Sequence, residues 1–148
     1  MIVFCDTNVH VAVLRGALTV ARLSELAPGT LRLSPVVASE LLRGARGKAR
    51  RAVEKLVARL VPIEPAAWAS AWLTAGRRLP AIFEKHESLG LARLQNDCLL
   101  AITARETGAL FVTADQHFAA LRQTIPFALK LLPGRLAPTL SSPTRPPS

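Results

Sequence analysis

Acidic residues are the side chains with the clearest potential for chemistry in this 148-residue sequence. The chain has only three aspartates, and each adjoins a predicted strand or helix. Asp6 directly follows an apolar run, Asp115 follows another by two residues, and Asp97 stands at the predicted start of a helix. Glu40 follows a further apolar run and falls in the predicted first turn of the next helix. If the apolar runs form parallel strands, these carboxylates meet at the edge where the strands end.

Four converging carboxylates predict a metal site. Carboxylates held close together repel one another unless cations neutralise them, and hard oxygen ligands select Mg²⁺ or Mn²⁺. Each acid has an alternative explanation as a helix N-cap, because a carboxylate at a helix start accepts backbone N–H groups and interacts favourably with the helix dipole. Independent caps, however, would not be expected to use every aspartate of the protein and a glutamate besides.

Short apolar runs alternate with amphipathic stretches, and this alternation predicts the elements that must position the acids. The predicted strands span residues 2–5, 31–37, 109–113 and 127–132. A short strand or edge segment is expected at 61–65, which contains two prolines. The predicted helices span the stretch after Asn8 up to residue 26, and then residues 39–43, 49–60, 66–78, 81–94, 94–107 and 115–122. Pro80 should end the helix at 66–78, and Gly90 should break the one that follows.

This order of elements predicts an α/β fold with a single domain. A central parallel sheet of about five strands should carry helices on both faces. We expect this domain to span residues 1–132, because the composition changes at Pro133 to Pro, Ser, Thr and Gly. Residues 133–148 are therefore predicted to form a flexible Pro/Ser-rich tail.

The overall composition excludes several classes of protein. Half of the residues are hydrophobic and 20% are charged, which is enough for one buried core and excludes wholesale disorder. No run approaches 18 apolar residues, and the first residues contain no basic leader, so we expect a cytoplasmic protein without a membrane span. Cys5 and Cys98 lie in apolar runs and are predicted to be reduced core thiols. No dinucleotide-binding or P-loop glycine motif occurs, and the histidines lack zinc-site spacing.

Positive charge is concentrated in one part of the chain. The 19 Lys and Arg residues outnumber the 10 acids, giving a net charge of +9, and residues 43–59 hold seven of the bases but only one acid. Such a one-sided stretch predicts a surface that contacts the phosphates of a polyanion. The alternative is an ordinary solvated helix face. The candidate RNA-binding residues in this stretch are Arg43, Arg46, Arg50 and Arg51.

An ordered set of motifs resembles the PIN domain family, and within it the VapC-like toxins of bacterial toxin–antitoxin pairs. The motifs, which run in this order between residues 2 and about 132, are Asp6-Thr7-Asn8, Glu40 in Val37-Ala-Ser-Glu-Leu-Leu, Asn96-Asp97 before Cys98-Leu-Leu-Ala, and Thr113-Ala-Asp115-Gln-His-Phe118. The resemblance implies a Mg²⁺- or Mn²⁺-dependent ribonuclease on a parallel sheet, often dimeric and inhibited by a cognate antitoxin. One departure is His117, which stands where many relatives carry a further acid.

We therefore interpret the chain as an endoribonuclease that hydrolyses RNA phosphodiester bonds. Asp6, Glu40, Asp97 and Asp115 would hold one or two metal ions that activate water. Asn8 and Thr113 would orient carboxylates or a water by hydrogen bonds, although turn and strand-end hydrogen bonding explains them equally well. The expected partners are an RNA substrate, an antitoxin and a second copy of the chain. The alternatives are a nuclease-inactive RNA-binding protein or an RNA-processing subunit on the same fold.

Overall fold

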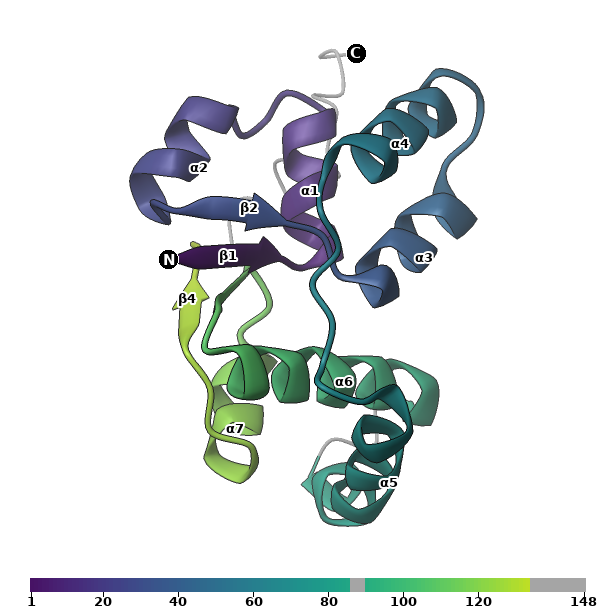
Figure 1. Ribbon diagram of the computed structural model, residues 1–148, viewed down its shortest axis with the longest axis vertical. Coiled ribbons are helices and arrows are strands. Elements are labelled where there is room, and N and C mark those ends of the chain that lie inside the picture. The colour runs from purple at the N-terminus through teal and green to yellow at the C-terminus, as the bar shows by residue number, and fades with distance from the viewer. Residues whose placement is uncertain (86–89, 134–148) are drawn as a thin grey trace, which may run out of the picture.

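Strands and helices alternate along the chain in a computed structural model that describes residues 1–85 and 90–133 (Figure 1). The strands are β1 (Ile2–Cys5), β2 (Thr30–Arg32), β3 (Leu110–Thr113) and β4 (Leu129–Leu131). The helices are α1 (Thr7–Leu14), α2 (Val20–Leu26), α3 (Pro35–Gly44), α4 (Gly47–Arg59), α5 (Trp68–Lys85), α6 (Leu91–Thr107) and α7 (His117–Thr124). This arrangement confirms the predicted α/β class.

The sheet is parallel throughout and has four strands in the order β2-β1-β3-β4. Phe4 at the centre of β1 pairs with Arg32 on one side and with Phe111 on the other, so all three strands end at the same edge. The fifth strand predicted at 61–65 is reduced to a single bridge between Leu33 and Pro62. A proline there has no N–H to donate to a ladder, which limits the pairing.

Both faces of the sheet are buried, because alternate strand residues point into different clusters of apolar side chains. Val3 and Cys5 pack on one face with residues of α1 and α2, whereas Phe4 packs on the other face with residues of α3, α5, α6 and α7. Figure 1 shows α1 and α2 on one side of β1, and α5, α6 and α7 on the other. Cys98 is also buried, and both thiols are free, as the sequence predicted.

The segment after β2 differs from the prediction, and this changes the position of Glu40 within its helix. A strand was expected over 31–37, but β2 ends at Arg32, and Ser34 caps α3 by accepting the N–H of Val36 at 3.2 Å. Pro35 follows as the first residue of α3, where its fixed φ suits a helix start. Glu40 is consequently the sixth residue of α3, in its second turn rather than its first.

Two other helix boundaries were predicted wrongly. Pro80 lies inside α5 and does not end it, because Ala71, Ala75 and Ile82 keep that helix packed in the core on both sides of the proline. The stretch up to residue 26 forms two helices, α1 and α2, rather than one. Part of the segment predicted as a helix over 81–94 lies outside the described residues, at 86–89.

The position of Asp97 also differs from the prediction. Gly90, with φ of +81°, precedes α6, which begins at Leu91, three residues before the predicted start at Leu94. Asp97 therefore lies in the second turn of α6 and not at its start. The final helix and strand, α7 and β4, begin two residues later than predicted.

The expected tail at 133–148 lies outside the described residues from 134 onward, so its conformation stays a prediction. None of the helices in residues 1–85 and 90–133 is long and apolar enough to cross a membrane.

Gly29 provides a test of how closely the first strands pack. Its φ is +153°, and a Cβ at this position would lie 2.5 Å from the carbonyl oxygen of Met1 and 2.8 Å from Val3 Cγ2. Gly29→Ala should therefore lower the free energy of unfolding by about 1–3 kcal/mol, measured by urea denaturation. Gly76→Ala is the matched control, because Gly76 lies inside α5 with no atom within 4 Å of the added Cβ. The control should gain about 0.5–1 kcal/mol. Equal stabilities for the two variants would contradict this account.

Candidate metal centre

Asp6 lies where β1 ends and α1 begins. It caps α1, because its Oδ1 accepts the backbone N–H of Thr7 at 2.8 Å. Its Oδ2 accepts the hydroxyl of Thr113 at 2.7 Å, and its backbone N–H donates to the carbonyl of Val112 at 2.8 Å. Asp6 is only 8% exposed, so its carboxylate is a buried link between the ends of β1 and β3.

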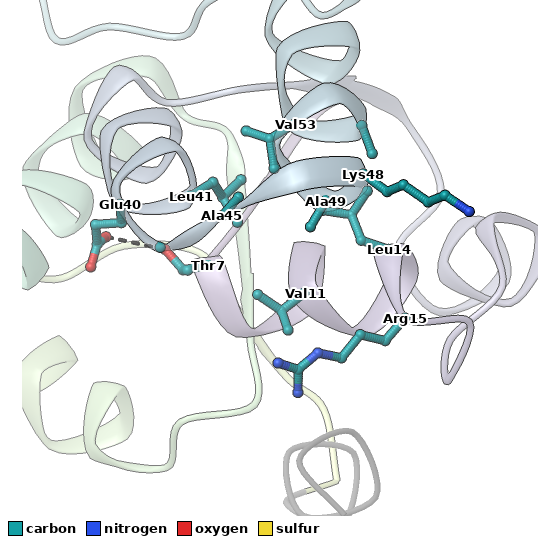
Figure 2. Close-up of a pocket in the computed structure, with 12 residues that line it drawn as sticks. Thr7, Val11, Leu14, Arg15, Glu40, Leu41, Ala45, Lys48, Ala49 and Val53 are labelled. Atoms are coloured by element: carbon teal, nitrogen blue, oxygen red, sulfur yellow. Dashed lines mark hydrogen bonds between the residues drawn. The ribbon is translucent and has the colours of Figure 1, made fainter. Parts of the chain in front are cut away.

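Glu40 reaches the same edge of the sheet from α3. The hydroxyl of Thr7 donates a hydrogen bond to Glu40 Oε1 at 3.1 Å, as Figure 2 shows. Thr7 therefore has two roles, since its backbone N–H binds Asp6 and its side chain binds Glu40. This single residue connects the first two carboxylates of the site.

Asp97 approaches from α6 and is 7% exposed. Because it lies in the second turn of that helix, the helix-cap explanation does not apply to it. Its Oδ2 lies 2.9 Å from His117 Nε2, which is an ion-pair contact when the imidazole is protonated. Asp97 is thus a buried acid that a helix end does not explain.

Asp115 follows β3 and faces α6. Its Oδ1 accepts the backbone N–H of His117 at 3.1 Å, and its Oδ2 forms an ion pair with the guanidinium of Arg93. Arg93 lies one turn before Asp97 on α6, so the same helix supplies both the acid and the cation. We call Asp6, Glu40, Asp97 and Asp115 the carboxylate cluster.

The members of the carboxylate cluster lie within reach of one another's charge. The pKa of Asp97 is raised to about 8, mainly by burial and also by the charges of its acidic neighbours Asp6, Asp115 and Glu40, against an opposing decrease from Arg93. An ionised Asp97 is therefore disfavoured when no cation neutralises its neighbours.

The pKa of Asp6 is also raised, but less than that of Asp97. Burial raises its pKa to about 6, and the charges of Glu40 and Asp115 act in the same direction. The hydrogen bonds from Thr113 and Thr7 oppose this rise because they stabilise the ionised form. The cluster thus combines buried oxygens, mutual repulsion and few cationic partners.

This donor chemistry fits a hard divalent cation. Carboxylate oxygens are the preferred ligands of Mg²⁺ and Mn²⁺, and Asp97 Oδ2 is buried without a hydrogen-bond partner. In the described parts of the chain, however, no three acidic, histidine or cysteine side chains are already arranged to hold an ion. Binding would therefore require side chains of the cluster to move toward the ion.

Asn8 and Thr113 support the cluster through hydrogen bonds. Thr113 donates to Asp6 and its hydroxyl oxygen accepts the backbone N–H of Asp115 at 3.0 Å. The side-chain amide of Asn8 contacts Asp6 Oδ2 and Thr113 Oγ1, each at 3.4 Å, and its carbonyl accepts the N–H of Ala114 at 3.2 Å. Both residues are placed to fix the orientation of Asp6 and the turn that leads to Asp115.

The four candidate RNA-binding arginines divide into two pairs. Arg46 donates to the carbonyls of Arg43 and Ala45, each at 3.2 Å, and Arg50 donates to the carbonyl of Leu42 at 3.0 Å. These bonds satisfy carbonyl groups at the end of α3, so this pair has a structural task. Arg43 and Arg51 are exposed on α3 and α4.

A largely apolar pocket of about 520 Å³ lies between α1, α3 and α4 (Figure 2). Glu40 and Thr7 lie at one end of it, and Lys48 and Arg15 also line it. The close-up shows Val11, Leu41 and Val53 among the apolar side chains between them. The pocket therefore brings an apolar surface up to one carboxylate of the cluster.

Sequence reasoning missed Thr7 and Arg93 as parts of this site. Thr7 belongs to the Asp6-Thr7-Asn8 motif, so its position next to two predicted site residues was available as a signal. Arg93 stands four residues before Asp97, which places both on one helical face, but its pairing with Asp115 depends on how α6 packs against the end of β3.

Comparison with known proteins identifies the family. Residues 3–123 match the PIN domain. The structure of VapBC2 from Rickettsia felis, bound to a DNA fragment from its promoter, has a TM-score of 0.59 and 24% identity, and covers 89% of this chain and 99% of that one. The structure of VapBC-1 from nontypeable Haemophilus influenzae has a TM-score of 0.62 and 20% identity, and covers 88% of this chain and 98% of that one.

At these identities the two structures show a common fold. No curated protein matches the chain. Since the matched segment is well over half of the sequence and contains all four members of the carboxylate cluster, the chain belongs to the PIN domain family.

Proposed function

We propose that this protein is a metal-dependent endoribonuclease and the toxin of a toxin–antitoxin pair. The observation that carries the proposal is the carboxylate cluster, in which burial and the charges of three neighbouring acids raise the pKa of Asp97 to about 8. A protein gains nothing in stability from burying mutually repelling acids, so such a cluster favours a cation-dependent function. Membership of the PIN domain family supports nuclease chemistry at this site.

The proposed roles follow from the positions of the side chains. The carboxylates of Asp6, Asp97, Asp115 and Glu40 would hold Mg²⁺ or Mn²⁺. When bound, the cation supplies Lewis acidity, which activates water and stabilises the negative charge that develops on the phosphate. Thr113 holds the Asp6 carboxylate by its 2.7 Å hydrogen bond, and Thr7 holds Glu40.

The proposed partners are an RNA substrate, a cognate antitoxin and a second copy of the chain. The net charge of +9 favours a polyanionic substrate. The fold shared with two VapBC structures supports an antitoxin that binds this chain. A cytoplasmic location is part of the same proposal, because RNA and an antitoxin would be encountered there.

The central test is cleavage of total RNA by the purified protein with and without Mg²⁺ or Mn²⁺, with mapping of the new ends. We expect cleavage only with metal, and a loss of at least about 100-fold in rate for Asp97→Asn, since this buried acid has no capping role. Glu25→Gln is the control, because Glu25 forms an exposed ion pair with Arg22 on α2. RNA binding without cleavage at any metal concentration would instead indicate the nuclease-inactive alternative.

The raised pKa values also predict how stability depends on pH in metal-free buffer. The folded state holds protons on Asp97 and Asp6 more tightly than the unfolded chain does, so the free energy of unfolding should fall as pH rises from about 4 to about 8. Asp97→Asn cannot ionise, and its stability relative to wild type should increase across this range, by about 1 kcal/mol or more at pH 8.

Urea denaturation at several pH values in the presence of EDTA measures this difference. Glu25→Gln should follow the wild type, because its partner lies on the surface and away from the cluster. Parallel curves for wild type and Asp97→Asn would show that the buried charge does not destabilise the fold.

Salt dependence tests the exposed pair of arginines. Replacing Arg43 and Arg51 together by Ala should reduce the slope of log affinity against log salt by about 0.7 for each lost phosphate contact on single-stranded RNA. The cleavage position should not change, because phosphate contacts position a substrate without identifying its bases. The matched control, Arg22→Ala, removes a base from α2. An unchanged slope for the double variant in filter binding would place the RNA elsewhere.

A further inference from the structure

We propose that a second pocket, between α1 and α4, holds one nucleotide of the RNA substrate, with its base against His10 and its phosphates on Lys55 and Arg59. This inference rests on the proposed ribonuclease function, and it names a place where the substrate is bound beside the carboxylate cluster. The pocket has a volume of about 220 Å³, which is room for a single nucleobase. We call it the His10 pocket.

Apolar side chains form most of the wall of the His10 pocket. Val13 and Leu14 come from α1, and Ala52 and Leu56 come from α4. Sites for small organic groups are usually built in this way, with apolar walls and a few polar groups that fix the orientation of the ligand. The flat faces of a nucleobase suit such a wall, and its polar edge requires a hydrogen-bonding partner.

His10 supplies the polar group in this wall. The residue is only 4% exposed, and its Nε2 is buried with no hydrogen-bond partner among residues 1–85 and 90–133. Burial lowers the pKa of His10 to about 4, so the imidazole is neutral at neutral pH. A neutral imidazole donates or accepts one hydrogen bond at Nε2, depending on its tautomer. A base edge that bonds to this nitrogen would remove the cost of leaving it unpaired.

Positive charge lines the α4 side of the His10 pocket. Lys55 and Arg59 are both exposed and lie four residues apart, which places them on one helix face about 6 Å apart along its axis. Glu54, the only acid between residues 43 and 59, does not line the pocket. A nucleotide combines an apolar base face with an anionic phosphate, so it matches both the wall and the cations. An apolar peptide segment would match only the wall.

The His10 pocket lies next to the carboxylate cluster. His10 is one helical turn along α1 from Asp6, and its backbone N–H donates to the carbonyl of Asp6 at 3.3 Å. The larger pocket of Figure 2, which has Glu40 at one end, shares Leu14 and Ala52 with the His10 pocket, so the two adjoin. An RNA strand with one phosphate at the cluster can therefore place a nearby nucleotide against His10.

RNA binding in the presence of EDTA tests the charged side of the pocket, because binding is then measured apart from cleavage. Lys55→Ala/Arg59→Ala should weaken binding of a short fluorescein-labelled single-stranded RNA by about tenfold at low salt. The slope of log affinity against log salt should fall by about 0.7 for each of the two lost phosphate contacts. Arg105→Ala/Arg122→Ala is the matched control, since it removes the same charge from the last turns of α6 and α7 and should keep the wild-type slope.

Base preference tests the role of His10. It is measured as the ratio of the weakest to the tightest Kd among oligo(A), oligo(C), oligo(G) and oligo(U). This ratio should fall by about threefold or more in His10→Leu, which keeps the wall apolar but removes the hydrogen bond. His10→Gln retains a hydrogen-bonding side chain and should keep a preference. If His10→Leu does not fold, ¹⁵N-histidine NMR of the wild type decides the point, since the His10 Nε2 resonance must shift when the preferred oligonucleotide is added.

Two results would overturn this inference. They are a wild-type salt slope in Lys55→Ala/Arg59→Ala and an unchanged base preference in His10→Leu, and both are expected if a protein partner occupies the pocket in place of RNA. Cleavage of RNA with Mg²⁺ or Mn²⁺ would then leave the proposed nuclease function intact. Conversely, the expected binding results without cleavage in either metal would support the His10 pocket and contradict the nuclease function.

Discussion

The hydrogen bond from the Thr113 hydroxyl to Asp6 is the contact on which the rest of the site depends. A buried carboxylate must have hydrogen-bond partners, and Asp6 finds them at the end of β3 and at the start of α1. The same hydroxyl accepts the N–H of Asp115 and so fixes the turn after β3. One interaction between residues 107 positions apart thus sets the relative positions of two strand ends, one helix start and two acids.

Burial of the carboxylate cluster opposes folding, and the apolar layers on the two faces of the sheet must compensate for it. The rings of Phe4 and Phe111 pack in a tilted arrangement with their centres 4.9 Å apart, and Phe111 makes a second tilted contact of the same length with Phe118. All three rings are fully buried beneath the helices that carry Asp97 and Glu40. The elements that bring the acids together are therefore the same ones that supply the apolar contacts offsetting their repulsion.

The sequence was most informative where local pattern and final packing agree. The apolar runs at 2–5 and 109–113 became β1 and β3 to within one residue, because strands buried on both faces must be apolar throughout. Prediction failed where local signals competed. Ser34-Pro35 starts a helix inside an apolar run, and α5 continues through Pro80 because the buried face of that helix stays packed in the core. The contact of Arg93 with Asp115 depends on tertiary packing, which periodicity does not reveal.

The helix-cap alternative illustrates why several acids had to be considered together. It is correct for Asp6, which does cap α1, and yet Asp6 also lies in the carboxylate cluster. It fails for Asp97, which has no helix end to satisfy and has the more strongly raised pKa. A cap and a ligand use the same oxygen chemistry, so one residue can serve both. The distinction between them comes from the acids that capping leaves unexplained, and in this fold those acids are Asp97 and Glu40, each in the second turn of its helix.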